Sequence, residues 1–140
     1  MSSLNLGFLL ANVSRQLRRN FQQRMTGMEL TFDQVRVLLL ISRQQGMRQI
    51  ELADMLEIQP ITLVHQIDQL AKKGIVERRP DPSDRRAYQL FVTDAAASHL
   101  AEIEKVGETV QREMLQGLDE QQIAQLTTVL TAMYGNLTQR

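Results

Sequence analysis

The spacing of apolar residues changes at Gly74, and this change limits the folds available to the chain. In residues 48–73, apolar side chains recur at the three- and four-residue spacing of amphipathic helices. Residues 75–79 form a short strand-like run, and residues 87–92 alternate between two faces, as in a strand. The turn-forming residues PDPSD (80–84) separate the two runs. The pattern predicts helices followed directly by a β-hairpin.

Pro60 divides the helical stretch into two helices. Because proline has no backbone N–H, it interrupts a helix interior but suits the first turn of a new helix. We therefore expect one short helix, then a second that starts near Gln59 or Pro60 and ends at Gly74. This is a helix-turn-helix, and the hairpin that follows makes it a winged helix. The positions of the second helix expected to face inward are Leu63 or Val64, Ile67 and Leu70.

Two more helices are predicted before the helix-turn-helix. Residues 4–25 carry apolar side chains at helical spacing, with a polar face that is rich in arginine. Thr31 and Gln34 are spaced as a capping box at the start of the next helix. Its apolar run, residues 35–41, is nearly continuous, so we expect this helix to be deeply buried and to end near Gly46.

Two amphipathic helices are predicted after the hairpin. Thr93 and Asp94 are expected to cap the first of them, and Leu118 and Asp119 start the second. Each helix has to bury its apolar stripe, because apolar area left in water costs about 25 cal/mol per Å².

The helices at the two chain ends carry more apolar surface than one small winged-helix core can cover. A second copy of the chain would cover it in a symmetric dimer; packing of every helix within one monomer is the alternative. We expect an N-terminal dimerisation helix in residues 1–29, a winged helix-turn-helix domain in residues 30–93 and C-terminal dimerisation helices in residues 94–140. The predicted fold class is mostly α with a small β-hairpin wing.

Composition excludes several classes of chemistry. The 140 residues include no cysteine, which removes disulfides, thiolate metal sites and cysteine nucleophiles. His65 and His99 are the two histidines and form no paired metal motif, so we expect neither a metal nor a cofactor. No catalytic motif predicts an enzyme. The absence of a long apolar run and of a signal-peptide pattern favours a cytoplasmic protein without a membrane partner.

The charges are distributed unevenly along the chain. The formal net charge is zero, but residues 1–93 hold 13 basic and 9 acidic side chains, whereas residues 94–140 hold 3 basic and 7 acidic ones. Such asymmetry suggests that the first part meets a polyanion and that the second part does something else.

The exposed face of the second helix offers groups that suit DNA bases. In a helix-turn-helix, the N-terminal half of this helix reads base edges in the major groove. Glutamine pairs with adenine, threonine contacts a base or a thymine methyl group, and histidine donates to guanine acceptors. An alternative is that the polar residues on this face are only solvated surface residues. The candidates for this face are Ile61, Thr62, His65, Gln66 and Gln69.

The hairpin turn carries a second set of candidates. Arg85 and Arg86 suit a narrow minor groove, because the planar guanidinium is weakly hydrated. Asp84 is expected to pair with Arg86 and fix the loop. For Arg85, a phosphate contact and plain exposure to solvent are both open.

Phosphate contacts are expected at two helix ends. Arg48 and Gln49 open the short helix, where free backbone N–H groups suit an anion, although Arg48 could equally face solvent. Lys72 and Lys73 close the next helix and either contact a phosphate or complement the helix dipole. A different function remains open, namely a winged helix used for protein–protein contact without operator binding.

Residues 38–93 resemble the multiple-antibiotic-resistance regulator (MarR) family of bacterial transcription factors. The segments on which the resemblance rests are QIELADML, the helix from Leu63-Val64 to Leu70, KKGIVERR and, above all, DPSDRRAYQLFVT. The resemblance implies a homodimer on a pseudo-palindromic operator in double-stranded DNA, with one recognition helix per half-site. It also implies that Arg86 enters the flanking minor groove with Asp84 as its partner.

The resemblance further implies a regulator controlled by a small molecule. Many members release DNA when an aromatic or phenolic ligand fills a cleft between the dimer helices and the winged helix, which implies a repressor here. Without cysteine the chain does not resemble the thiol-oxidation sensors, and its two separated histidines are unlike the zinc-sensing members. The ligand-binding residues stay unassigned, because apolar cleft and core positions look alike in sequence.

Overall fold

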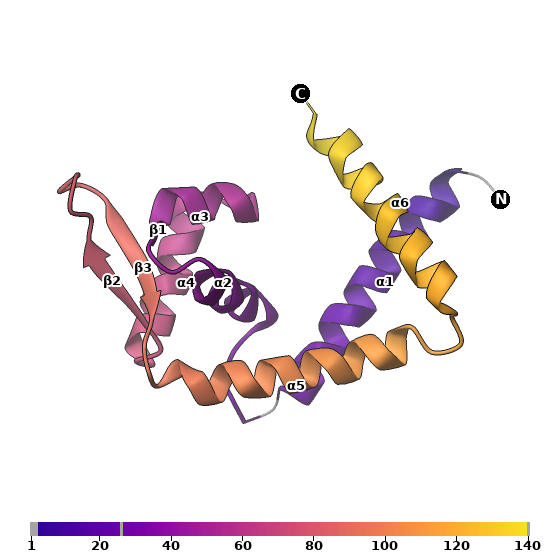
Figure 1. The fold of residues 1–140 in the computed structure, drawn as a ribbon, viewed down its shortest axis with the longest axis horizontal. Helices are drawn as coiled ribbons and strands as arrows, with labels where there is room; N and C mark the ends of the chain where they lie inside the picture. Colours follow the sequence, from indigo (N-terminus) through magenta and orange to yellow (C-terminus); the bar gives the residue numbers. More distant parts are fainter. Residues whose placement is uncertain (1–2, 26, 140) are drawn as a thin grey trace.

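The computed structural model describes residues 3–25 and 27–139. The elements in chain order are α1 (Ser3–Arg24), α2 (Phe32–Arg43), β1 (Met47–Arg48), α3 (Gln49–Leu56), α4 (Pro60–Lys72), β2 (Val76–Pro80), β3 (Tyr88–Val92), α5 (Ala96–Met114) and α6 (Glu120–Thr138). The predicted mostly α fold with a β wing is confirmed. The helices α2 to α4 and the sheet gather at one end of α5, and α6 departs from its other end (Figure 1).

The wing contains one strand more than the predicted hairpin. The sheet has the order β1-β3-β2 and is antiparallel throughout. In β1, Met47 pairs with Leu90 and Arg48 pairs with Gln89. A strand of two residues is too short to show an alternating pattern, which is why the sequence did not indicate it. This short strand joins the wing to the start of α3.

The core of the winged helix lies between α2, α3, α4 and the sheet. Leu63 is fully buried whereas Val64 is half-buried, so Leu63 is the inward residue of the first turn of α4. Leu63, Ile67 and Leu70 then follow one stripe of the helix. Fully buried side chains around this stripe include Leu38, Ile41, Leu52, Ile75 and Leu90.

Most of the predicted helix ends are confirmed. The backbone N–H of Gln34 donates to the Thr31 hydroxyl, and the Gln34 side chain accepts from the Thr31 N–H, as a capping box requires. Pro60 is the first residue of α4. Gly74 follows α4 with a φ of +76°, a conformation that glycine adopts without steric cost. Asp119 caps α6.

The predicted cap at Thr93 and Asp94 is wrong. Helix α5 begins at Ala96, and its N-cap residue is Ala95, which has no capping side chain. Thr93 instead continues the sheet, because its backbone N–H donates to the carbonyl of Ile75. Its hydroxyl donates to the Gly74 carbonyl at 2.6 Å, so the side chain closes the α4–β2 turn rather than the helix.

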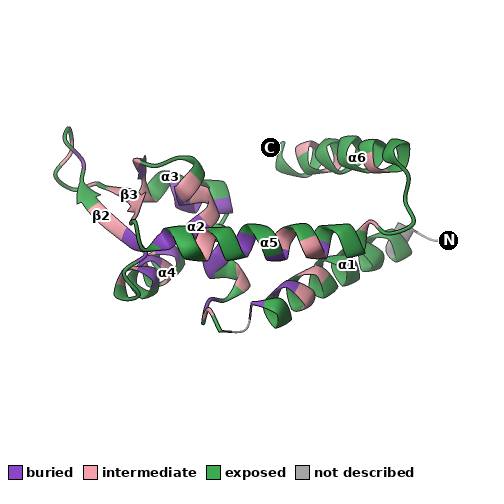
Figure 2. Ribbon diagram, turned by 60° about the horizontal axis from the view of Figure 1, so that its bottom comes forward, coloured by how far each residue is buried: buried purple, intermediate pink, exposed green. Residues whose placement is uncertain are grey.

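The outer helices differ in how far they are covered. Phe21 and Met25 at the end of α1 are buried, as are Ile103 and Val106 on α5, and Arg24 pairs with Glu113 between these helices. Helix α6 has no buried residue among those described (Figure 2). No described helix is both long and apolar enough to cross a membrane.

Candidate nucleic-acid interface

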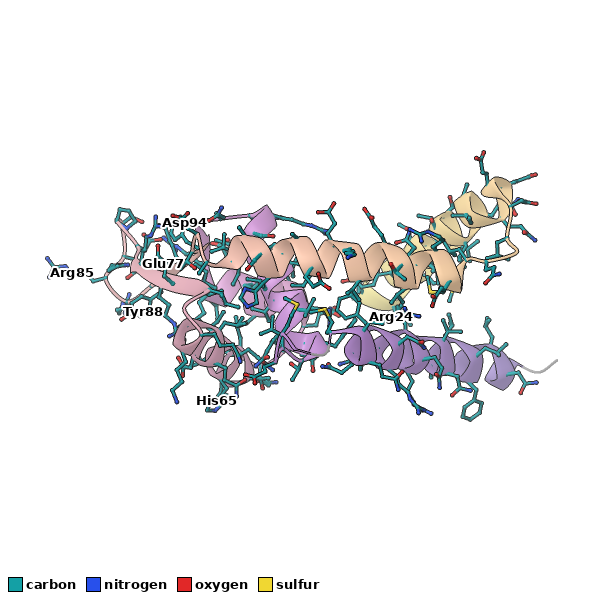
Figure 3. All side chains as sticks on the ribbon, turned by 90° about the horizontal axis from the view of Figure 1, so that it is seen from below. Arg24, His65, Glu77, Arg85, Tyr88 and Asp94 are labelled. Atoms are coloured by element: carbon teal, nitrogen blue, oxygen red, sulfur yellow. The ribbon has the colours of Figure 1, made fainter. Side chains whose placement is uncertain are left out.

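The N-terminal half of α4 is open to solvent. Ile61 is 63% exposed. Thr62 and His65 are also exposed, and His65 points away from the body of the molecule (Figure 3). The sequence predicted a face of five residues; these three and Gln69 are exposed, whereas Gln66 is half-buried.

The two glutamines expected on the same face lie closer to α2. Gln66 is half-buried and lines a narrow cleft with Arg36 and Val37, where its Oε1 has no hydrogen-bond partner in the described residues. The Oε1 of Gln69 accepts a hydrogen bond from the side chain of Gln34, which is buried in α2. Gln69 therefore already joins α4 to α2.

The wing loop presents two exposed arginines. The side chain of Arg86 is 93% exposed, and Arg85 projects from the tip of the wing (Figure 3). The carboxylate of Asp84 accepts from the Arg86 backbone N–H at 2.9 Å and lies 3.7 Å from its Nε. The expected pairing of Asp84 with Arg86 is present, with its shorter contact to the backbone.

Asp81 is the main anchor of the loop, and it was not among the predicted residues. It is 7% exposed, and its carboxylate accepts from the Ser83 N–H, the Ser83 hydroxyl and the Asp84 N–H. It also accepts from Arg48 Nε at 2.8 Å. The hydrogen bonds from Ser83 and then Arg48 hold the pKa of Asp81 well below its usual range. The Asp-Pro-Ser turn composition could have indicated this role.

The low pKa of Asp81 gives stability a pH dependence of defined sign. Its contacts contribute fully above the ordinary pKa of 3.8, and the contribution is lost as the pH falls below that value. We expect Asp81→Asn to lower the Tm at pH 7 and the difference from wild type to shrink toward pH 3, as followed by circular dichroism. Asp54→Asn, at an exposed carboxylate, should leave the Tm unchanged. A Tm difference independent of pH would contradict this role.

Arg48 and Gln49 hold the wing in addition to opening α3. Arg48 Nη2 donates to the Ser83 hydroxyl at 3.2 Å, and the hydrogen bond to Asp81 raises the pKa of Arg48. The side-chain amide oxygen Oε1 of Gln49 accepts from Arg78 Nε at 2.9 Å. Arg48 and Gln49, both predicted to contact phosphate, therefore make contacts within the chain. Arg78, like Asp81, is a residue of the wing that the sequence analysis did not single out.

A concave surface lies between the start of α3 and the wing. It has a volume of about 430 Å³, and its lining includes Arg48, Gln49, Arg86 and Tyr88.

At the far end of α4, Lys72 is exposed and Lys73 lies 3.7 Å from the carboxylate of Glu29. Among the described residues, no group of histidine, aspartate and glutamate side chains could hold a metal ion.

This arrangement defines a winged helix-turn-helix protein, with an accessible second helix next to an arginine-tipped wing. The family model of the MarR family matches residues 30–88. The structure of the transcriptional regulator PA3341 is similar over nearly the whole chain, with 32% identity, coverage of 96% of this chain and 99% of that one, and a TM-score of 0.86. The chain belongs to the MarR family.

Two further solved structures are similar over most of the chain. A cysteine-to-serine mutant of MarR from E. coli, solved in complex with operator DNA, has 26% identity and a TM-score of 0.85, with 92% of this chain and 93% of that one covered. A MarR transcriptional regulator from Methanosarcina mazei Go1 shares the fold, with 23% identity, a TM-score of 0.89 and 96% of each chain covered.

Proposed function

We propose that this chain is a dimeric transcriptional regulator that binds a pseudo-palindromic operator through α4 and the wing. The observation that carries the proposal is the exposure of Ile61, Thr62 and His65 at the same end of the molecule as Arg85 and Arg86. The similarity to the E. coli protein solved with operator DNA supports it.

In this proposal, α4 lies in the major groove. Thr62 and His65 hydrogen-bond to base edges, and Ile61 contacts a thymine methyl group. Gln66 and Gln69, expected from sequence to read bases as well, support the helix from the side of α2, in line with the contact between Gln69 and Gln34. The wing places Arg86 in the adjacent minor groove, where a narrow A·T-rich groove concentrates negative potential.

Phosphates flanking the two grooves complete the proposed contact. Gln49 and Ile50 at the start of α3 line the concave surface beside the wing, where Arg48 and Arg86 supply positive charge next to Asp84. Arg48 acts there while it remains bound to Asp81. Lys72, Lys73 and Arg85 add further phosphate contacts from the end of α4 and the tip of the wing.

A salt series tests DNA binding directly. Each phosphate neutralised by the protein releases counterions, so affinity falls steeply as salt rises. For a dimer with about 6–10 phosphate contacts, we expect affinity for a duplex selected from a random-sequence library to fall roughly 10³- to 10⁵-fold between about 50 and 200 mM salt. Fluorescence anisotropy measures it. A flat salt response, or failure to enrich any sequence, would contradict operator binding.

The proposed dimer is formed by both chain ends. On α6, Val129 is 53% exposed and Tyr134 is 58% exposed, and on α1, Leu9 and Val13 are similarly open. Between α1 and α5 lies a groove of about 390 Å³ with mostly apolar side chains. Apolar surface of this extent is unfavourable in a monomer, so a second copy that covers it is the economical arrangement.

The proposal includes a repressing role that a small organic ligand relieves. It rests on the family resemblance, because the groove of about 390 Å³ is lined by α1 and α5 alone and belongs to the surface that the proposed second copy covers. A ligand bound between the dimer helices and the winged helix would shift the spacing of the two α4 helices away from half-sites one helical turn apart. Titration of phenol and of benzoate into the operator complex tests this. If neither compound releases the DNA, an aromatic effector is contradicted.

A further inference from the structure

Arg78 in β2 is bound to two different helices at once. Its Nε donates to the side-chain amide oxygen Oε1 of Gln49 at 2.9 Å, at the start of α3. Its Nη2 lies 2.7 Å from the Asp68 carboxylate and 3.3 Å from the Val64 carbonyl oxygen, both on α4. One side chain of the wing therefore holds the first residue of α3 and the middle of α4 together.

These contacts indicate a brace rather than a DNA contact. The side chain of Arg78 is 24% exposed, against 93% for Arg86. Its guanidinium is fixed by an amide, a carboxylate and a carbonyl from two other elements, and the rigid planar group can satisfy all three in one geometry. A lysine at this place would keep the charge, but its donors share one nitrogen, whereas Nε and Nη2 of the guanidinium reach α3 and α4 separately.

The next residue in the strand provides an internal comparison. Arg79 pairs with Glu77 of its own strand, and its guanidinium lies 3.8 Å from the centroid of the Phe91 ring in β3. Both partners of Arg79 belong to the hairpin, so it cannot link the wing to a helix. Arg78 and Arg79 carry the same charge one residue apart but differ in what they connect.

We propose that Arg78 is a positioning residue that fixes the wing relative to the recognition helix α4. The wing arginines and the α4 side chains must reach neighbouring grooves of one duplex together, which requires a fixed angle between the two elements. Arg48 and Asp81 hold the loop of the wing to β1, directly before α3, whereas Arg78 joins its strand to α4 itself. This inference rests on the proposed operator binding, and it also predicts a property of the free protein.

The first experiment measures the free protein. Because the chain contains no cysteine, Arg85→Cys and His65→Cys introduce two unique sites for spin labels, one on the wing and one on α4. Labelled chains are diluted with unlabelled wild type so that distances within one chain dominate. The distance distribution is measured by pulsed electron paramagnetic resonance. We expect a broader and shifted distribution in Arg78→Ala and Arg78→Lys, and the wild-type distribution in Arg79→Ala. Identical distributions in all four proteins would overturn the proposal.

The second experiment measures coupling on DNA, with the duplex selected by the wild-type chain. We expect Arg86→Ala to weaken binding roughly fivefold to 150-fold in wild type but less than about twofold in the Arg78→Ala background, because an unfixed wing no longer places Arg86 in the groove. In the Arg79→Ala background, the full loss from Arg86→Ala should persist. Additive losses of Arg78→Ala and Arg86→Ala would overturn the positioning role.

The two experiments separate failure of this inference from failure of the proposed function. A wild-type chain that selects no duplex refutes operator binding, while the spin-label distances still decide whether Arg78 fixes the wing. A direct phosphate contact by Arg78 would instead reduce the salt slope by about one unit with unchanged label distances, and this result also rejects the positioning role.

Discussion

Replacement of Arg86 by alanine should weaken operator binding by about 1–3 kcal/mol, roughly fivefold to 150-fold, and relax sequence preference at the wing-facing positions. The side chain is 93% exposed, so its removal takes little from the folded protein. The loss should appear in anisotropy titrations, whereas size and Tm stay unchanged. Lys105→Ala removes the same charge from an exposed position on α5 and should leave operator affinity close to wild type.

The same variant separates the two functions that the sequence left open. A winged helix that serves only for protein–protein contact would show no operator binding for Arg86→Ala to weaken. Lost DNA affinity with an intact dimer supports the DNA-binding regulator alone. Arg85→Ala, measured in parallel, decides whether Arg85 contacts a phosphate. Loss of such a contact would weaken binding to all DNA sequences equally and lower the salt slope by about one unit.

Leu130→Glu on α6 should disrupt the proposed dimer, which Arg86→Ala leaves intact. Leu130 is 40% exposed in the single chain and lies on the apolar side of α6, so a carboxylate there would be buried without a partner in the proposed dimer. We expect the mass in sedimentation to halve. Operator affinity should fall about 10²- to 10⁴-fold, because a separated chain binds only one half-site.

A matched substitution on the same helix controls for the added charge. Gln125 is an exposed residue of α6, and its place in the helix is about 140° of rotation from Leu130, given 100° per residue. Gln125→Glu should leave both the dimer and operator affinity intact. A wild-type chain that sediments as a monomer at micromolar concentration would refute the dimer.

The elements that local chemistry determines could be predicted from the sequence. Pro60 marks the start of α4, Gly74 marks its end, and the Thr31–Gln34 capping box marks the start of α2. Each of these signals depends on residues within a few positions of one another. The exposure of Ile61, Thr62 and His65 also followed from the helical period, since the opposite stripe is apolar.

The contacts that fix the wing could not be predicted, because they join residues far apart in the sequence. Asp81 accepts from Arg48, which is 33 positions away, and Gln49 accepts from Arg78, which is 29 positions away. Apolar period shows which side of a helix is buried, but it does not show which polar side chains meet. A charged residue at a helix start therefore suggested a phosphate, whereas in the fold it first binds the wing.

The lack of any buried residue on α6 has a consequence for chains that have not yet met a partner. An isolated helix of 19 residues is only marginally stable in water, since most helical stability in proteins comes from tertiary packing. On a lone chain, α6 should therefore fray first and offer unfolded backbone to proteases. In the proposed dimer the same segment is covered, so surplus single chains would be degraded selectively while assembled regulator persists.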